Sequence, residues 1–217
     1  VLVDALRALR IQTPKRVVVG ACPSGTPLIT SRASPPLSDV LARLGKDSDN
    51  FVAEMVLKIL GAERKRKPGR SQDGATVVTE ALGRMNVPLA GLAIVNGSGL
   101  FNGNAVSAEQ LARTLVAMHD NPSLRNDYVT HLAVGGADGT LARRFLDVPV
   151  PRIVRAKTGT LNDVIALSGY VLGRKPDEAF AFAFLANGVT GKHAQARGLI
   201  DRIVRELALV MHSTPTK

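Results

Sequence analysis

The chain has 217 residues, of which 45% are hydrophobic, so it is long and apolar enough for one globular domain with a real core, and extensive disorder is not expected. Its formal net charge of +10 fits a nucleic acid, an anionic membrane or an acidic polymer such as a cell wall as partner, and charge alone does not choose among them. No apolar run reaches the ~18–20 residues of a transmembrane helix, and a single cysteine excludes an internal disulfide. The four histidines are scattered, so neither a metal site nor a cofactor is predicted.

Short elements and one long loop are expected at the N-terminal end. Apolar spacing predicts a helix over residues 1–11, and a β-branched run predicts a short strand over residues 17–19. Residues 21–36 are rich in Pro, Ser, Gly and Thr, which indicates a loop. A short helix over residues 38–44 follows, and we expect Gly45 to stop it.

Helices dominate the next part of the chain. Apolar residues at helical spacing predict a well-buried helix over residues 50–60 that ends at Gly61, and another helix over residues 77–85. The basic run over residues 63–70 contains no aromatic residue, which favours a solvated loop over a nucleic-acid element.

Two later helix starts are marked by their first residues. Ser107-Ala-Glu-Gln110 is a capping box, which predicts a helix through Met118. Asn121 followed by Pro122 predicts the start of the next helix, with the asparagine as cap and the proline in the first turn.

The pattern changes to strands in the C-terminal third. Residues 152–157 are apolar at alternate positions, residues 164–172 form a longer β-rich run, and Phe alternates with Ala over residues 179–184. Residues 173–178 have the composition of a hairpin loop, and residues 192–211 have the apolar spacing of a helix. Helices followed by three antiparallel strands and a helix predict an α+β fold rather than a parallel βαβ repeat.

Two short motifs carry the functional signal. Ser48-Asp49-Asn50 lies at the entry to a predicted helix, and Lys157-Thr158-Gly159-Thr160 lies at the end of a predicted strand. Alone, the first motif would be interpreted as a helix N-cap and the second as an exposed strand end. Their occurrence together and in this order is much rarer, and class A β-lactamases and penicillin-binding proteins carry this pair.

Further segments around the two motifs point to one group within these proteins. In chain order they are residues 34–40, 46–54, 96–100 and 138–145. Together with the motifs, they resemble the class C low-molecular-mass penicillin-binding proteins, the peptidase S13-like group of D-alanyl-D-alanine carboxypeptidases and endopeptidases. The resemblance runs over essentially the whole chain, but over only the latter part of such a protein. One departure is Asn96, where that group more often has Asp.

The resemblance implies a serine β-lactamase/transpeptidase-like fold, an antiparallel sheet flanked by helices. No serine of this chain is followed three residues later by a lysine, so the Ser-x-x-Lys motif that supplies the acyl-accepting serine and its base is absent. We therefore expect residues 1–217 to be the C-terminal portion of the catalytic domain, without the N-terminal portion and any inserted domains. Alone, such a chain should not turn over substrate.

The resemblance also implies a substrate and its location. It is the peptidoglycan stem peptide ending in D-Ala-D-Ala, with β-lactams as inhibitors, and the setting is extracytoplasmic. The Lys157 ammonium would attract the terminal carboxylate of the peptide. Thr158 and Thr160, on either side of Gly159 in the substrate-binding strand, would add hydrogen bonds from their hydroxyls.

Three catalytic roles follow from the same resemblance. The Ser48 hydroxyl would relay a proton to the leaving D-alanine, and the Asn50 amide would hold the peptide carbonyl. The backbone N–H of Thr160 would form half of the oxyanion hole. The nucleophile would come from the N-terminal segment of the same protein, which is thus an expected partner.

Two alternatives come from other functional classes. A class A β-lactamase needs a glutamate followed four residues later by an asparagine, and no glutamate between the two motifs meets this requirement. A pseudoenzyme or cell-wall-binding module that kept the fold and lost the nucleophile stays open. A nucleic-acid-binding module would rest on charge alone, and nucleic acid is not expected as a partner.

Overall fold

The computed structural model describes residues 2–13, 20–175 and 177–213 of the chain. They fall into two compact units, Val1–Ser34 and Pro35–Lys217. In the first unit, α1 (Leu2–Ala8) confirms the N-terminal helix, although it ends before Arg10, whose φ is +59°. The expected loop is present after residue 20. The predicted strand over residues 17–19 lies outside the described residues.

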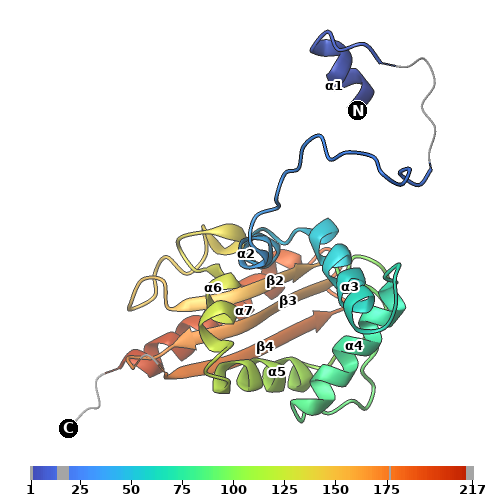
Figure 1. Cartoon of the computed structure of the whole chain (residues 1–217). Coiled ribbons are helices and arrows are strands. Elements are labelled where there is room, and N and C mark those ends of the chain that lie inside the picture. Colours follow the sequence, from blue (N-terminus) through green and yellow to red (C-terminus); the bar gives the residue numbers. More distant parts are fainter. Residues whose placement is uncertain (1, 14–19, 176, 214–217) are drawn as a thin grey trace. The chain divides into compact units, whose positions relative to one another are not determined.

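The second unit is an α+β domain, as predicted (Figure 1). Its helices are α2 (Leu37–Asp47), α3 (Asn50–Arg64), α4 (Ser71–Arg84), α5 (Ala108–Asp120), α6 (Arg125–His131), the 3₁₀ helix η1 (Gly139–Leu141) and α7 (His193–His212). Its strands are β1 (Ala133–Val134), β2 (Val154–Thr160), β3 (Val164–Leu172) and β4 (Ala179–Asn187). They form one antiparallel sheet in the order β1-β2-β3-β4. The three long strands were predicted, whereas the two-residue β1 was not.

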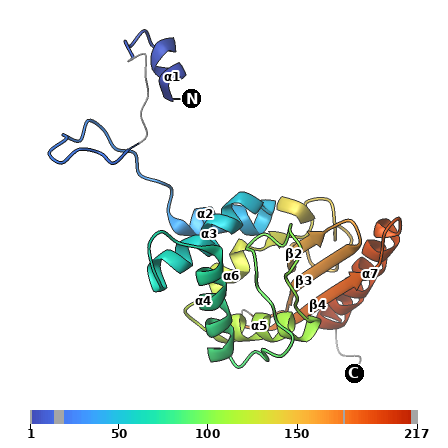
Figure 2. The same ribbon diagram turned by 90° about the vertical axis from the view of Figure 1, so that its right-hand side faces the viewer.

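The sheet lies between α7 on one face and α5 on the other (Figure 2). The larger core is on the α7 face, where Leu167 and Phe182 pack with Val204 and other buried apolar residues. On the opposite face, Tyr170 packs against Leu115 of α5, and its hydroxyl donates to the Leu115 carbonyl at 2.6 Å. The alternation of Phe and Ala in β4 therefore separates the face covered by α7 from the face covered by α5. Within the described residues, no helix is long and apolar enough to span a membrane.

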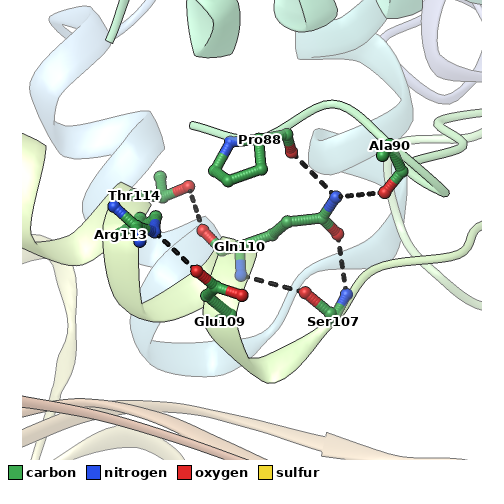
Figure 3. Close-up of polar contacts among 7 residues, drawn as sticks. All are labelled: Pro88, Ala90, Ser107, Glu109, Gln110, Arg113 and Thr114. Atoms are coloured by element: carbon green, nitrogen blue, oxygen red, sulfur yellow. Dashed lines mark hydrogen bonds and ion pairs between the residues drawn. The ribbon is translucent and has the colours of Figure 1, made fainter. Parts of the chain in front are cut away.

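The predicted capping box is confirmed at the start of α5 (Figure 3). The Ser107 hydroxyl accepts from the Gln110 backbone N–H at 3.1 Å, and the Gln110 side chain accepts from the Ser107 backbone N–H at 2.8 Å. The buried Gln110 amide also donates to the carbonyls of Pro88 and Ala90, at 2.8 and 3.1 Å. One side chain thus caps the helix and fixes the loop that follows α4.

The two glycines expected to end helices lie inside them instead. α2 continues through Gly45 to Asp47, and a Cβ atom at Gly45 would lie 2.1 Å from the carbonyl oxygen of His131 in α6. α3 continues through Gly61 to Arg64, and a Cβ atom at Gly61 would lie 2.9 Å from the backbone nitrogen of Gly74 in α4. The prediction was wrong because both glycines allow two helices to approach closely, and neither has the positive φ of a helix-ending glycine.

Two further predictions about helices were wrong. α3 is not well buried, because Phe51 and Ile59 expose 71% and 54% of their surface. α6 begins after Leu124 rather than at Asn121, whose side-chain oxygen accepts from the Ser123 backbone N–H at 3.1 Å and hydroxyl at 2.7 Å. Asn121 therefore stabilises a turn rather than a helix start.

Candidate active site

The residues of the two motifs meet in space. Lys157, in β2, donates from its ammonium to the Ser48 hydroxyl at 2.6 Å and to the Thr158 carbonyl oxygen at 2.8 Å. Burial lowers the pKa of Lys157, because desolvation disfavours the charged ammonium. The two hydrogen bonds together hold the ammonium at one position next to Ser48.

The turn between α2 and α3 places Ser48. Ser48 is the C-cap of α2 and has left-handed backbone angles, with φ 59° and ψ 49°, a conformation that costs energy in a residue with a side chain. Asp49 then caps α3, because its side chain accepts from the Val52 backbone N–H at 3.0 Å. The capping role expected for this motif thus belongs to Asp49, which leaves the Ser48 hydroxyl free to contact Lys157.

Asn50 is the first residue of α3 and is exposed. It lies two residues beyond Ser48 on the same turn. In the part of the chain that the structure describes, no hydrogen bond joins its side chain to Lys157 or Ser48. The structure therefore brings Ser48 and Lys157 into direct contact, and Asn50 follows Ser48 at the start of α3 without joining that contact.

The end of β2 is a free sheet edge. The backbone hydrogen bonds from Leu161 to Val164 and from Leu172 to Ile153, both 2.9 Å, show that odd-numbered residues of β2 pair with β3. Even-numbered residues, including Thr158 and Thr160, consequently direct their N–H and C=O groups to the other edge. β1 pairs there only with residues 155 and 156. The Thr160 backbone N–H is thus available at an edge that no described strand covers.

The segment after β1 fastens α2 to β2. Asp138 forms an ion pair with Lys46 and accepts from the Val134 backbone N–H at 2.8 Å. Gly139 has φ +53°, and a Cβ atom there would lie 2.4 Å from the Lys46 carbonyl oxygen. The neighbouring Thr140 accepts from the Thr158 hydroxyl at 3.0 Å. The segment over residues 138–145 was recognised in the sequence as part of the family resemblance, but the sequence alone gave it no role.

A hollow of about 390 Å³ lies at the end of β2, next to the start of β3. Its lining consists of Thr140, Arg144, Thr158, Gly159, Thr160, Ile165, Ala166 and Arg197. The three predicted substrate-binding residues thus share one hollow. The segment of Thr140 and Arg144, residues 138–145, was recognised in the sequence, but neither residue was given a role there. Sequence reasoning missed Arg197, because it lies alone on α7 and forms no local motif.

Comparison with known proteins matches this geometry to one family. The model of the D-Ala-D-Ala carboxypeptidase 3 (S13) family matches residues 1–208. The chain belongs to this family. Among curated relatives, a D-alanyl-D-alanine carboxypeptidase of Actinomadura sp. (strain R39) is 33% identical over 195 residues, which are 87% of this chain and 36% of the relative. The D-alanyl-D-alanine carboxypeptidase DacB of Haemophilus influenzae is 28% identical over 84% of this chain and 38% of the relative.

Solved structures agree with the S13 assignment. Penicillin-binding protein 4 of H. influenzae, in complex with a β-lactam, has a TM-score of 0.77 and 25% identity, and the match covers 95% of this chain and 49% of that one. A predatory endopeptidase of Bdellovibrio bacteriovorus has a TM-score of 0.65 at 21% identity, which shows a shared fold. The resemblance found in the sequence and the expected transpeptidase-like fold are thereby confirmed. The chain spans about half or less of the length of these relatives.

A loop of this S13 chain packs against α3, the helix that begins at Asn50. The Glu54 carboxylate accepts from the Ser98 hydroxyl at 2.6 Å and backbone N–H at 2.9 Å, and the hydrogen bond from the hydroxyl is the main cause of the lowered pKa of Glu54. Asn96 donates from its side chain to the Phe101 carbonyl at 3.0 Å and accepts from the Gly99 backbone N–H at 2.8 Å. An ionised aspartate could not make the first of these bonds, so the departure at Asn96 has a local function.

The described residues contain no group of three His, Cys, Asp or Glu side chains that could hold a metal ion.

Proposed function

We propose that this chain is the C-terminal portion of the catalytic domain of a serine D-alanyl-D-alanine carboxypeptidase that acts on peptidoglycan outside the cytoplasm. The observation that carries the proposal is the contact between Lys157 and Ser48 beside the free edge of β2. Membership of the S13 family supports the reaction class. The natural ligands would be stem peptides ending in D-Ala-D-Ala, and β-lactams would occupy the same site.

The acyl-accepting serine and its lysine base would come from the N-terminal segment of the same protein. The serine oxygen attacks the carbonyl carbon of the penultimate D-alanine, the C–N bond breaks, and the amine of the last D-alanine leaves with a proton. Water then hydrolyses the acyl-enzyme. The backbone N–H of Thr160, at the free edge, would hold the developing oxyanion. The Asn50 amide would hold the peptide carbonyl of the substrate.

The Lys157 contact gives Ser48 a defined orientation for the proton transfer. A lysine ammonium has only donors, so the Ser48 oxygen must accept in this hydrogen bond. The hydroxyl proton of Ser48 then points away from Lys157 and can be given to the leaving amine. The lowered pKa of Lys157 favours this transfer, because a more acidic ammonium returns a proton to Ser48 more readily.

Labelling with a fluorescent penicillin tests the proposal. The 217-residue chain alone should form no covalent adduct, because acylation needs the activated serine. Co-expression with the N-terminal segment that carries Ser-x-x-Lys should restore labelling. A stable adduct on the chain alone would show that the nucleophile lies within these 217 residues and not in the N-terminal segment. An unlabelled complex that still binds peptidoglycan would instead favour the wall-binding pseudoenzyme.

A further inference from the structure

The hollow beside β2 is lined by basic and hydroxyl side chains. Its lining contains three threonine hydroxyls and two arginines, and no carboxylate. Arg144 does not bring a free charge, because its guanidinium forms an ion pair with Asp201, and both side chains are largely buried, with 16% and 10% of their surface exposed. Arg197, in the second turn of α7, is exposed, and no ion pair among the described residues includes it. The hollow therefore offers one uncompensated positive charge.

The hydroxyls of the hollow are also available as donors. Thr158 donates to Thr140 at 3.0 Å, so the proton of the Thr140 hydroxyl is directed to another acceptor. Thr160 is the last residue of β2 and is exposed. A guanidinium and two hydroxyl donors around one space form a typical setting for a carboxylate.

Lys157 points away from this hollow. In the sheet, Lys157 lies beside Ser168, on the face that Tyr170 shares with α5. Thr158 lies beside Leu167, whose side chain belongs to the core under α7. Two of the three ammonium hydrogens of Lys157 are already used by Ser48 and the Thr158 carbonyl. Lys157 is thus placed to orient Ser48, whereas Arg197 is on the α7 side, with the two threonine hydroxyls.

We infer that this hollow binds the C-terminal carboxylate of the peptide substrate, and that Arg197, rather than Lys157, is the residue that recognises it. The inference rests on the proposed peptidase function. A peptide whose scissile carbonyl lies at the Thr160 N–H places its terminal carboxylate one residue further, roughly 3.3 Å along an extended chain. Thr158, Thr160 and Arg197 all line the same hollow, so the carboxylate would stay within it. A planar guanidinium can hold both oxygens of that carboxylate.

Equilibrium binding tests this without any turnover, in the 217-residue chain complemented with its N-terminal segment in which the Ser-x-x-Lys serine is replaced by alanine. The ligands are N-acetyl-D-Ala-D-Ala and the same dipeptide with a C-terminal amide, measured by calorimetry. The acid should bind about 10–100-fold more tightly than the amide, the range for one hydrogen bond to a charged group. Arg197→Gln should abolish this preference, and Arg197→Lys should restore it only in part.

Arg202→Gln is the matched control, because Arg202 is exposed on the same helix but does not line the hollow, and it should bind like the wild type. Equal binding of acid and amide, no binding of either, or an Arg197→Gln variant that still prefers the acid would overturn the inference. Penicillin labelling of the complete protein is a separate readout. If labelling succeeds and the carboxylate preference is independent of Arg197, the proposed function stands and only this inference fails.

Discussion

The Lys157 ammonium and the Ser48 hydroxyl lie 2.6 Å apart, although the two residues are separated by 109 positions in the chain. Lys157 is in a central part of the sheet, and Ser48 is in a helix–helix turn. The contact therefore depends on what holds α2 in place, namely the ion pair between Lys46 and Asp138 and the close approach of Gly45 to His131 of α6. Each part of this arrangement can be tested by itself.

Removal of the Ser48 hydroxyl should reduce catalysis without unfolding the protein. In the protein complemented with its N-terminal segment, Ser48→Ala should lower kcat on a peptide ending in D-Ala-D-Ala by about 10²–10⁴-fold, the usual contribution of a positioned proton-transfer group. Ser38→Ala, an exposed position in the first turn of α2, should leave kcat unchanged. Steady-state kinetics measure both variants. A Ser48→Ala enzyme with full kcat would exclude Ser48 as the proton relay.

The buried ammonium of Lys157 should leave a trace in the pH dependence of stability. Its pKa in the folded protein is below the ordinary value of 10.5, so between these two values the unfolded chain binds more protons than the folded one. The free energy of unfolding of the wild type should therefore rise with pH in this interval, relative to Lys157→Met. Urea unfolding at pH values between 7 and about 10.5 measures the difference.

The exposed Lys175 provides the control for that experiment, since Lys175→Met removes the same charge from the hairpin loop between β3 and β4. Its pH profile should run parallel to that of the wild type. If Lys157→Met also runs parallel, the Lys157 ammonium is not desolvated as described.

A methyl group at Gly45 should separate α2 from α6. Gly45→Ala would bring a Cβ atom to 2.1 Å from the His131 carbonyl oxygen, so the helices must move apart, at a cost of about 1–3 kcal/mol in the free energy of unfolding. Gly198→Ala is the matched control, because that glycine also lies in a helix, α7, but a Cβ atom there would meet nothing within 4 Å. It should stabilise the protein by roughly 0.5–1 kcal/mol, the usual gain in a helix.

Urea unfolding compares the two glycine variants. Equal and small effects of Gly45→Ala and Gly198→Ala would contradict the close packing of α2 on α6. Because this packing also fixes Ser48, Gly45→Ala should lower the activity of the complemented protein as well.

Regular periodicity made much of the fold predictable. The strand over residues 164–172 and the C-terminal helix were found within a residue or so, because each buries one long apolar face. The burial of α3 was not predictable, since the exposure of Phe51 and Ile59 depends on which elements pack against the helix. Gly45 could not be interpreted correctly for the same reason, because its neighbour His131 is distant in the sequence.

The candidate site was predictable only where its residues are adjacent in the chain. The two tripeptides that contain Ser48 and Lys157 were recognised as motifs, and the structure brings these two side chains together. Arg197 has no such signal, because a lone arginine on an exposed helix surface resembles any solvated charge. Its position in the same hollow as Thr160 follows from the packing of α7 on the sheet, which only the folded chain reveals.

The strand order has a practical consequence for the isolated chain. β4 is the last strand of the sheet, and its register together with the hydrogen bond from Gly173 to Glu178 directs the N–H and C=O groups of Ala181, Ala183 and Leu185 outward. Residues 179–187 contain neither proline nor a charged side chain, the usual protections against edge-to-edge pairing. At high concentration, copies of this chain should therefore pair with one another through β4 and aggregate. A segment that pairs with β4 should prevent this aggregation.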